Sequence, residues 1–548
     1  MTLSQFLSNT GTEKLTPDDI QLLQKWNAAT PTPVNMCTHE LVREVCLEQP
    51  EAIAISASDG QWTYAEIDSF SSALARRLIR LGVGAGVFVP ICIEKSCWVI
   101  IGMMAVLKAG GAFLLLDRSH PPDRLLGVCQ DISATVVLAS ASCFHLATIL
   151  AETALVISEN VSTVDNDDFS MKFYVQSQSP MYAVFTSGST GKPKGAVVSH
   201  SAFTSMATEV LPSLGINRQS RVLQFSSNAF DAILSDYWIT LLAGGCVCIP
   251  SESEIQNRLS PYINELNINW ALLTPSVARI LSPEQVPTIQ HLAIGGEAIL
   301  QCDIDMWSPH VRLIGMYGLA ECAVFSAVQP DMSKAISPSS LNHLLAVNGW
   351  VVDPQDHNML LPVGEEGELL LEGPCLGDGY VNQPELTAMA FIESPAWLDM
   401  SGQKRSGNGR MYKTGDLFRL NSDGVLQYRG RKGTQVKLRG QRIELGEVES
   451  VARECCPEAR GIVAEVVRRN HGQLVNLCLF LHYAQDQGTD ERGAESSTIF
   501  ERPTTRFQDQ ADQLLLQLRE RLPRYMVPEY VLPINYIPRN TSSKTNRR

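Results

Sequence analysis

The sequence predicts an α/β protein with two domains. We expect a large N-terminal domain of parallel-rich sheets with helices plus a small β unit, and a smaller, mobile α+β C-terminal domain. Apolar runs of strand length alternate with helical patterns over residues 40–120, and the alternation recurs around 222–296, the order that produces parallel strands with right-handed crossovers. Between about 360 and 430 the pattern changes to short strands with turn signals. The length of 548 residues suits roughly three or four folding units.

The elements of the N-terminal domain follow from periodicity. Helical patterns cover residues 65–81 and 97–111, and both end in glycines. Strand patterns fall at residues 87–93, 112–117, 222–227, 246–250, 270–275 and 291–296. Several of these strands end in Ser, Thr, Pro or Gly, as expected where parallel strands open onto a ligand crevice. Further along, the polar stretch 484–510 predicts a loop insertion.

Composition narrows the classes of partner. Hydrophobic residues make up 45% and charged residues 19%, which excludes disorder as the main state. Lys and Arg number 44 against 58 Asp and Glu, so the formal net charge is −14. Because such a surface repels phosphate backbones and anionic lipid, we expect no nucleic-acid partner and no membrane partner. Any bound anion must then be held by a local device.

The N-terminus and the cysteines predict a cytoplasmic protein. The first residues have neither a cationic start nor a long apolar segment, so we expect no signal peptide there. The most apolar stretch, residues 97–107, is shorter than the ~20 residues that span a bilayer. The 14 cysteines include no C-x-x-C pair, and Cys246 and Cys248 lie in an apolar run typical of buried thiols. Reduced thiols in the cytoplasm fit this pattern.

The strongest local signal is TSGSTGKPKG, residues 186–195, directly after the apolar run MYAVF. Its glycines, hydroxyls and two lysines can surround a phosphate with N–H, O–H and ammonium donors. It is not a Walker loop, because Gly188 and Gly191 are too close together and Pro193 follows Lys192. Taken alone, the string also fits a flexible polar turn.

Further blocks follow in an order that resembles the adenylate-forming enzymes. They are WTYAEI (62–67), LKAGGAFLLLD (107–117), FDA (230–232), MYGLAE (316–321), GELLLEGPCLGDGYVNQPELT (367–387), YKTGDL (412–417), GRKGTQVKLRGQRIELGEVE (430–449), LPRYMVP (522–528) and TSSKTNRR (541–548). The resemblance covers nearly the whole chain. Within that superfamily it is similar to the amino-acid-activating adenylation domains of nonribosomal peptide synthetases, and the wording of the blocks is closer to fungal than to bacterial ones.

The resemblance implies a two-step reaction with ATP and Mg²⁺. An amino acid is activated as aminoacyl-AMP and then transferred to the phosphopantetheine thiol of a carrier domain. Both steps develop negative charge, so they call for positioning and electrostatic stabilisation more than for a protein nucleophile. The implied partners are the carrier (thiolation) domain and a condensation domain of a parent synthetase, since neither type of site occurs in this sequence.

The resemblance also implies the residues that bind ATP and AMP. They are Thr186, Ser187, Gly188, Ser189, Thr190, Gly191 and Lys194 at the phosphates, Gly295, Gly296, Glu297 and Tyr317 at the adenine, Asp416 at the ribose, and Arg431. Three of these have simpler alternatives. Tyr317 after an apolar strand also fits a core residue, Asp416 an ordinary Gly-Asp turn, and Arg431 an exposed basic residue at a domain junction.

Two residues are implied in catalysis. Glu321 corresponds to the acidic residue that supports Mg²⁺, and a carboxylate suits a hard cation. Lys544 resembles the lysine of the family's terminal block, whose ammonium lies between the substrate carboxylate and the α-phosphate and neutralises charge that grows in the transition state. In isolation, a lysine in such a polar tail would simply be solvated.

The substrate pocket implied by the resemblance begins with Asp231, which pairs with the α-ammonium of the amino acid. Its alternative is a helix N-cap before AILSDYW. Matching around the blocks gives the remaining pocket residues as Ala232, Ser235, Leu272, Ala293, Gly295, Met316, Val324 and Phe325. Because the lining carries no further charge beyond Lys544, we expect a neutral, medium-to-large or modified amino acid.

Two departures from the family pattern bear on activity. Leu319 and Ala320 stand where the family block usually has Pro and Thr, so a phosphate-facing hydroxyl is missing. Gly433 stands at the usual hinge Asp and keeps the torsional freedom of a hinge.

We therefore expect a core over residues 1–430, with a β subdomain at 360–430, and a mobile subdomain over 431–548. An acyl- or aryl-CoA ligase and a non-catalytic nucleotide-binding module remain alternatives.

Overall fold

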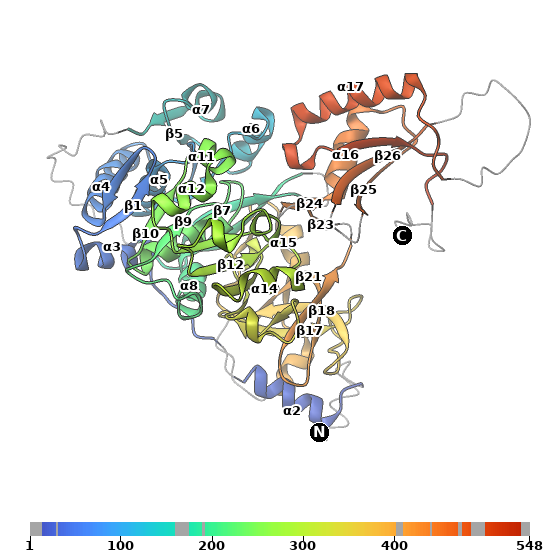
Figure 1. Ribbon diagram of the computed structural model, residues 1–548, viewed down its shortest axis with the longest axis horizontal. Helices are drawn as coiled ribbons and strands as arrows, with labels where there is room; N and C mark the ends of the chain where they lie inside the picture. The colour runs from blue at the N-terminus through green and yellow to red at the C-terminus, as the bar shows by residue number, and fades with distance from the viewer. Residues whose placement is uncertain are drawn as a thin grey trace, which may run out of the picture. The chain divides into compact units, whose positions relative to one another are not determined.

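The computed structural model describes residues 14–28, 31–158, 175–188, 192–401, 409–433, 435–438, 441–469, 474–483 and 499–538. The chain divides into two compact units (Figure 1). The first comprises Met1–Arg118, Cys129–Phe185 and Gly195–Lys432, and the second comprises Ser119–Val128, Thr186–Lys194 and Gly433–Arg548. The mixture of large sheets and helices confirms the predicted α/β class.

The largest sheet of the first unit has nine strands in the order β16-β14-β13-β12-β11-β9-β10-β1-β2. Its strands are β1 (Ile53–Ala57), β2 (Gly60–Thr63), β9 (Arg221–Leu223), β10 (Cys246–Ile249), β11 (Trp270–Leu273), β12 (His291–Gly295), β13 (Arg312–Tyr317), β14 (Ala327–Gln329) and β16 (His343–Leu344). The central pairs from β13 to β1 are parallel, and the edge strands are antiparallel. Cys246 and Cys248 are buried in β10, as predicted.

A second sheet has seven strands in the order β19-β8-β7-β4-β3-β5-β6. Its strands are β3 (Phe88–Cys92), β4 (Ala112–Leu115), β5 (Val136–Ala139), β6 (Thr153–Val156), β7 (Pro180–Thr186), β8 (Lys194–Ser199) and β19 (Gly379–Tyr380). Helix α5 (Cys97–Lys108) is buried along nearly its whole length and connects β3 to the parallel strand β4. The strand–helix–strand prediction for this region is therefore confirmed.

Helices and short helical turns precede the strands or connect them along the chain (Figure 1). They are α2 (Pro17–Trp26), α3 (Thr38–Glu48), α4 (Tyr64–Arg80), α6 (Pro122–Asp131), α7 (Phe144–Leu150), α8 (His200–Leu214), α9 (Ala232–Leu234), the π-helix η1 (Ser235–Ile239), α10 (Thr240–Leu242), α11 (Glu252–Asn257), α12 (Leu259–Glu265), α13 (Pro275–Ala278), α14 (Gln301–Trp307), the 3₁₀ turn η3 (Ala320–Cys322) and α15 (Pro384–Ala390). Helix α4 starts where predicted because Thr63 and Glu66 form a capping box. None of the described helices has the length and apolar character needed to cross a bilayer.

The third sheet of the first unit is antiparallel and has six strands. They are β15 (Ser340–Leu341), β17 (Asn348–Val352), β18 (Glu366–Glu372), β20 (Phe391–Glu393), β21 (Arg410–Leu420) and β22 (Leu426–Arg431). The strands β15 and β17 precede residue 360, where turn signals first became frequent in the sequence. The sheet therefore recruits strands from upstream of the predicted β subdomain.

The second unit is α+β. It contains β23 (Gln435–Leu438), β24 (Gln441–Glu444), α16 (Leu445–Cys455), β25 (Gly461–Arg469), β26 (Leu474–His482), α17 (Thr505–Arg521) and β27 (Tyr530–Pro533). Strand β26 lies between β25 and β27, and α16 packs against β25 and α17. Its core includes Ile443, Val448, Leu479 and Leu518.

Two sequence-based boundaries were wrong. The strand predicted at 222–227 ends at Leu223, because the carbonyls of Phe225 and Ser226 accept hydrogen bonds from the Lys95 ammonium instead of a neighbouring strand. The loop predicted at 484–510 ends earlier, since α17 begins at Thr505 behind the N-cap Thr504. Residues 484–498 lie outside the described part of the chain.

Candidate active site

Four predicted pocket residues lie on one face of the nine-stranded sheet, toward the carboxyl ends of its parallel strands. Leu272 of β11 is in register with Ala293 of β12, and Gly295 of β12 is in register with Met316 of β13. Because side chains alternate along a strand, Ala293 and Gly295 share a face, and their register partners share it with them. This is the edge at which parallel sheets usually bind ligands.

Gly295 is a glycine for backbone reasons. A Cβ atom there would lie 2.7 Å from the carbonyl oxygen of Met316 on the neighbouring strand. The small size of this pocket position is therefore imposed by strand packing, and it leaves depth beside Ala293.

Three more predicted pocket residues, Asp231, Ala232 and Ser235, lie on one short helical segment. Asp231 stands at the N-cap position of α9, but its side chain makes no capping hydrogen bond. The alternative that Asp231 serves as a helix cap is therefore not supported. Ser235 opens the π-helix η1, and its Oγ donates to the carbonyl of Ala232 at 2.7 Å. A π-helix of this kind is often found at functional sites.

The last two pocket residues, Val324 and Phe325, follow the 3₁₀ turn η3 and are buried. Ala323 and Val324 adopt φ angles of 50° and 79°, which is unusual for residues with a side chain and above all for a β-branched valine. A Cβ on Gly318 would lie 1.8 Å from the Val324 carbonyl oxygen, so the loop closes tightly on that glycine. Such strain is typical of functional loops held by their surroundings.

Three residues assigned to the nucleotide are in direct contact. Tyr317 Oη donates to Asp416 Oδ2 at 2.7 Å, and Arg431 Nη1 forms an ion pair with Asp416 Oδ1 at 2.8 Å. The Asp416 carboxylate is fully buried, and Asp416 faces Arg431 across β21 and β22. Burial and the Asp416 charge raise the pKa of Tyr317 well above its usual value, so its hydroxyl remains a donor.

These two contacts do not use the full acceptor capacity of the Asp416 carboxylate. Each carboxylate oxygen offers about two lone-pair directions, and Tyr317 and Arg431 occupy one on each oxygen. Asp416 can therefore still accept hydrogen bonds from two hydroxyl groups. Asp416 lies within strand β21, so the alternative of an ordinary Gly-Asp turn is not supported.

Glu321 is fully buried in η3, and its Oε1 accepts a hydrogen bond of 2.9 Å from the Tyr380 hydroxyl. Gly377 N–H donates to the backbone carbonyl of Glu321 at 2.8 Å. Tyr380 also lines an open groove of about 970 Å³ together with Asp378, Phe391 and Arg410. Burial raises the pKa of Asp378 to about 6 against the opposing charge of Arg410.

At the predicted adenine edge, one oxygen of the Glu297 carboxylate is already engaged. Its Oε2 accepts from Ser276 N at 3.0 Å and from Ser276 Oγ at 2.5 Å. Gly296 follows β12 with a φ of 82°. The other carboxylate oxygen, Oε1, is buried and has no hydrogen-bonding partner among the described residues, so both it and the backbone remain for a base at this position.

The phosphate-loop residues belong to the second unit. Gly188 must be a glycine, because a Cβ there would lie 2.0 Å from the carbonyl oxygen of Lys192. Ser187 Oγ accepts a hydrogen bond of 3.1 Å from Glu444 N, and Lys194 starts β8. Ser189, Thr190 and Gly191 lie outside the described residues, as does Lys544.

The loop has spare donor capacity suited to phosphate. Thr186 Oγ1 is buried and has no hydrogen-bonding partner among the described residues. An orphaned buried hydroxyl at the end of β7 fits an anionic ligand that would accept from it. The residues present are therefore compatible with nucleotide phosphates, and Glu321 is compatible with Mg²⁺.

Sequence reasoning missed three residues around these sites: Tyr380, Lys95 and Asp236. Tyr380 lies within the GELLLEGPCLGDGYVNQPELT block but carries no motif of its own, and its partner Glu321 is 59 residues away. Lys95 reaches Gln224 over 129 residues. For Lys95 and Asp236 the only sequence signal was a charged residue beside an apolar run, and for Tyr380 it was its place in that block.

Among the described residues, Cys37, His39 and His200 form a buried group whose potential ligand atoms lie within 4.8 Å of one another. Thr38 N–H donates to His200 Nδ1 at 3.2 Å, so the proton of the neutral ring lies on Nε2. Burial raises the pKa of Cys37 to about 12, and its thiol donates to the Val175 carbonyl. One structural role of the group is to satisfy the first N–H of α3, through His200 Nδ1.

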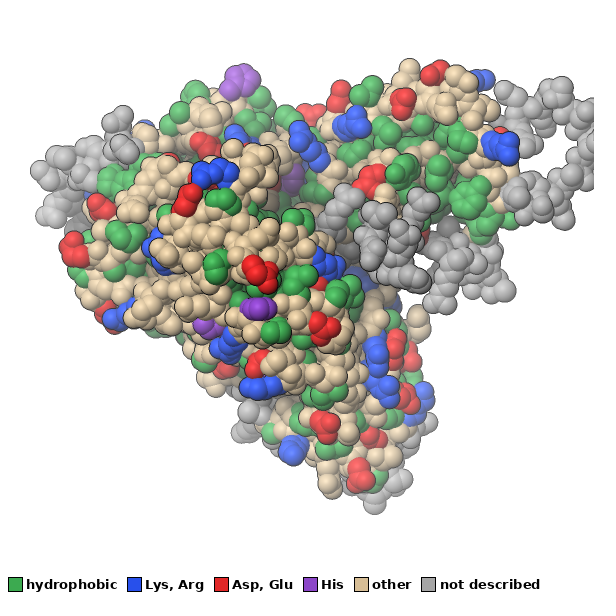
Figure 2. Space-filling view, in the orientation of Figure 1, with side chains coloured by type: hydrophobic (Ala, Val, Ile, Leu, Met, Phe, Trp, Pro, Cys, Tyr) green, Lys and Arg blue, Asp and Glu red, His purple; other side chains and the backbone are tan. Residues whose placement is uncertain are grey.

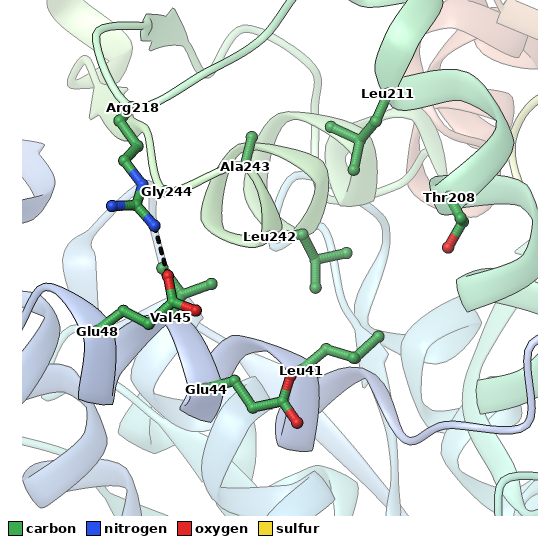
Figure 3. Close-up of a pocket in the computed structure, with 10 residues that line it drawn as sticks. All are labelled: Leu41, Glu44, Val45, Glu48, Thr208, Leu211, Arg218, Leu242, Ala243 and Gly244. Atoms are coloured by element: carbon green, nitrogen blue, oxygen red, sulfur yellow. Dashed lines mark hydrogen bonds and ion pairs between the residues drawn. The ribbon is translucent and has the colours of Figure 1, made fainter.

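A separate cavity of about 290 Å³ lies between α3, α8 and the turn after α10 (Figure 3). Leu41, Leu211 and Leu242 give it an apolar wall, and Arg218 forms an ion pair with Glu48 at its rim. None of the predicted site residues lines it. On the face shown in Figure 2, the described acidic and basic side chains are interspersed and do not gather into a broad area of one sign.

Comparisons with known proteins identify the family. The AMP-binding enzyme family matches residues 42–381. The chain is 44% identical to the nonribosomal peptide synthetase flvI of Aspergillus flavus over 94% of this chain and 47% of that protein. It is 41% identical to D-lysergyl-peptide-synthetase subunit 2 of Epichloe festucae var. lolii over 97% of this chain and 40% of that protein.

The fold is shared with solved structures of other proteins. An artificially fused adenylation–PCP didomain from Klebsiella oxytoca, NpsA-ThdA, aligns with a TM-score of 0.72 at 21% identity, over 91% of this chain and 93% of that one. The amide bond synthetase McbA from Marinactinospora thermotolerans aligns with a TM-score of 0.75 at 19% identity, over 93% and 98%. The chain spans about half or less of the curated relatives it matches. It belongs to the AMP-binding enzyme family of AMP-forming ligases and is similar over nearly its whole length to part of the nonribosomal peptide synthetases of fungi.

Proposed function

We propose that this chain activates an amino acid as aminoacyl-AMP and transfers it to the phosphopantetheine thiol of a carrier domain. The observation that carries the nucleotide half of this proposal is the buried Asp416 carboxylate held by Tyr317 and Arg431. A carboxylate fixed in this way and still able to accept two hydrogen bonds suits the vicinal hydroxyls of a ribose. The ion pair with Arg431 holds the carboxylate in place.

The remaining nucleotide contacts are assigned by the family blocks. Thr186 to Gly191 and Lys194 hold the phosphates, with the Thr186 hydroxyl free among the described residues to donate. Gly295, Gly296 and Glu297 offer backbone groups to the adenine, and the Tyr317 ring packs beside it. The Tyr317 ring is braced edge-on by Phe418 at 5.1 Å between ring centroids, which limits its orientation.

Glu321 is proposed to support Mg²⁺, which would neutralise phosphate charge when bound. The hydroxyl of Tyr380 orients the Glu321 carboxylate through one oxygen. A buried carboxylate that is oriented before the metal arrives loses less freedom on binding. The missing hydroxyl at Ala320 removes one polar contact next to it, while leaving the carboxylate itself.

Substrate selection is proposed to rest on Asp231 and on the sheet face below it. Asp231 would pair with the α-ammonium, and Ser235, Leu272, Ala293, Met316, Val324 and Phe325 would surround the side chain. Small residues at Ala293 and Gly295 leave depth, and the other walls are apolar. We infer a neutral, medium-to-large or modified amino acid as substrate.

Lys544 is proposed to act in the adenylation step, and a carrier domain to act in the second. The nonribosomal peptide synthetases that this chain resembles are larger than the chain. The carrier and a condensation domain are therefore proposed as partners within a longer cytoplasmic synthetase. The acidic net charge of −14 supports neither nucleic acid nor anionic membrane as a partner.

Amino-acid-dependent exchange of pyrophosphate into ATP tests the proposal. The panel contains the amino acids, with fatty and aryl acids as controls for a CoA ligase. We expect exchange with one or a few neutral amino acids and none with the controls. The Lys544→Ala variant should lose exchange while its thermal unfolding stays unchanged. By analogy with other charge-stabilising groups, we expect the variant to lose ~3–4 kcal/mol of transition-state stabilisation. Normal exchange in that variant would refute the assignment of Lys544.

A further inference from the structure

We infer that Lys95 and Asp236 are positioning residues for amino-acid recognition, because they hold the loop that leads from β9 to Asp231. This loop, residues 224–230, is here called the pocket loop. The inference rests on the proposed role of Asp231 and adds residues that touch neither the substrate nor the nucleotide.

Lys95 holds the start of the pocket loop. Its ammonium donates to Gln224 Oε1 at 2.6 Å, to the Phe225 carbonyl at 3.0 Å and to the Ser226 carbonyl at 2.8 Å. All three donors of the ammonium are therefore used on consecutive residues. Gln224 is fully buried, and its amide donates to the Ser226 carbonyl at 2.7 Å, which closes the turn.

Asp236 holds the same turn from the helical side. It is fully buried in η1, directly after the pocket residue Ser235, and its Oδ2 accepts from Phe225 N at 3.3 Å. Residues 224–236 thus begin at a turn held by Lys95 and end at Asp236, which contacts the same turn. Asp231, Ala232 and Ser235 all lie between the two.

The rest of the pocket loop is fastened by residues that follow β3 and β4. Asn228 donates to the Ile93 carbonyl at 3.1 Å, and Ser227 donates to Asp117. Because β3 and β4 are neighbouring parallel strands, both anchors lie at the carboxyl ends of strands of the seven-stranded sheet. A change at Lys95 should therefore displace the pocket loop against a rigid frame, and Asp231 with it.

The two charges depend on each other. Burial lowers the pKa of Lys95 to about 8, against the opposing influence of Asp236, Asp117 and Glu252. Burial raises the pKa of Asp236 to about 7, against the influence of Lys95 and of the donors on Phe225, Ser226 and Gln224. Removing the Asp236 charge should lower the pKa of Lys95 further, so that the ammonium is lost at a lower pH.

The test compares Lys95→Met with Lys108→Met in pyrophosphate exchange. Lys108 is a matched control, since its buried ammonium bonds to Asp68, Ser71 and Ser72 between α4 and α5, away from the pocket loop. We expect Lys95→Met to raise KM for the amino acid about tenfold or more, because a displaced Asp231 would lose its charged hydrogen bond with the substrate ammonium. KM for ATP should stay within about twofold of the wild-type value. Lys108→Met should change stability but neither KM. Equal KM values for the amino acid in the two variants, or equal rises for both substrates, would overturn the inference.

The Asp236→Asn variant supplies a second measurement if Lys95→Met does not fold. In the pH profile of kcat/KM for the amino acid, the fall at alkaline pH should occur at a lower pH in this variant than in the wild type, because Lys95 loses its charge earlier. The substrate's own ammonium titrates identically in both enzymes and cannot cause this difference. A fall at the same pH in both enzymes would overturn the inference. A wild-type enzyme inactive towards every amino acid would refute the proposed function, and the inference with it.

Discussion

Asp231 carries the distinction between an amino acid and other carboxylic acids in the proposed site. Replacing it with Ala should raise KM for the amino acid about ten- to a hundredfold, because the α-ammonium loses a charged partner, and should barely change KM for ATP. Steady-state pyrophosphate exchange measures both constants. Equal losses for both substrates would mean that Asp231 is structural. That outcome would need another explanation than helix capping, since its side chain makes no capping bond.

Tyr380 gives a single-atom test of the Glu321 assignment. The Tyr380→Phe variant removes only the hydroxyl that donates to Glu321 at 2.9 Å, so the carboxylate should be less well oriented. We expect a severalfold higher Mg²⁺ concentration for half-maximal exchange, with KM for the amino acid unchanged.

Tyr262→Phe is the control for this experiment, because the buried Tyr262 hydroxyl has no hydrogen-bonding partner among the described residues. It should match the wild type in its Mg²⁺ dependence. A Tyr380→Phe enzyme with the wild-type Mg²⁺ dependence would separate Tyr380 from the metal.

At the scale of single residues, the sequence predicted a role only where the residue lies in one of the family's sequence blocks. Tyr317, Asp416 and Arg431 were assigned singly by their blocks, yet their mutual contacts join positions up to 99 residues apart and were not foreseen. Lys95 and Asp236 escaped notice because a charge beside an apolar run is usually solvated. Only the fold makes Lys95 reach the pocket loop.

Among elements, periodicity predicted most where packing agreed with it. Helix α4 and strands β3 and β4 lie where their patterns placed them, because their apolar faces are buried in the same core. The strand at β9 was overestimated, since hydrogen bonds from Lys95 compete for its last carbonyls. The start of α17 was hidden in polar residues, although Phe507, Ala511, Leu514 and Leu518 form a buried stripe at helical spacing.

The start of helix α3 should make folding sensitive to acid. Burial lowers the pKa of His39 to about 4 and that of His200 to about 3, so both are neutral in the folded protein at neutral pH. Below pH ~6.5 the unfolded chain binds protons that the folded chain does not, and stability contributed by these residues falls as pH falls.

Urea unfolding at several pH values tests this. The stability advantage of the wild type over a His200→Gln variant should shrink by about 1.4 kcal/mol for each pH unit below ~6.5. A variant of the exposed His145 should follow the wild type throughout. An advantage that stays constant between pH 7 and pH 4.5 would show that His200 is protonated without cost.

At the scale of the whole molecule, the two half-reactions make conflicting demands. In the proposed reaction, Lys544 has to reach the α-phosphate for adenylation, whereas the carrier thiol needs an open route to the same carbonyl carbon. One arrangement of the chain cannot serve both. We therefore propose that residues 434–548 rotate as a unit about Gly433 between the two steps, in the manner of hinge closures that work through a few residues.

Gly433 has the torsional property such a hinge requires. Its φ is 90°, a value that residues with side chains rarely adopt, and among the described residues other than its chain neighbours no atom lies within 4 Å of a Cβ built there. Substitution at this position is therefore limited by backbone conformation and not by space. Gly433→Ala should be strained by ~1–2 kcal/mol in this conformation but still able to rotate.

Gly433→Pro should separate the half-reactions, because the ring fixes φ near about −65° and excludes the conformation seen here. We expect the variant to retain pyrophosphate exchange and to lose aminoacyl transfer to a supplied carrier domain, at most one of the two geometries being accessible. Gly433→Ala, which keeps a rotatable φ, should slow transfer only partly. Wild-type rates of both half-reactions in the proline variant would show that the rotation occurs elsewhere in the chain. Loss of both, with an unchanged unfolding temperature, would place Gly433 in the adenylation geometry as well.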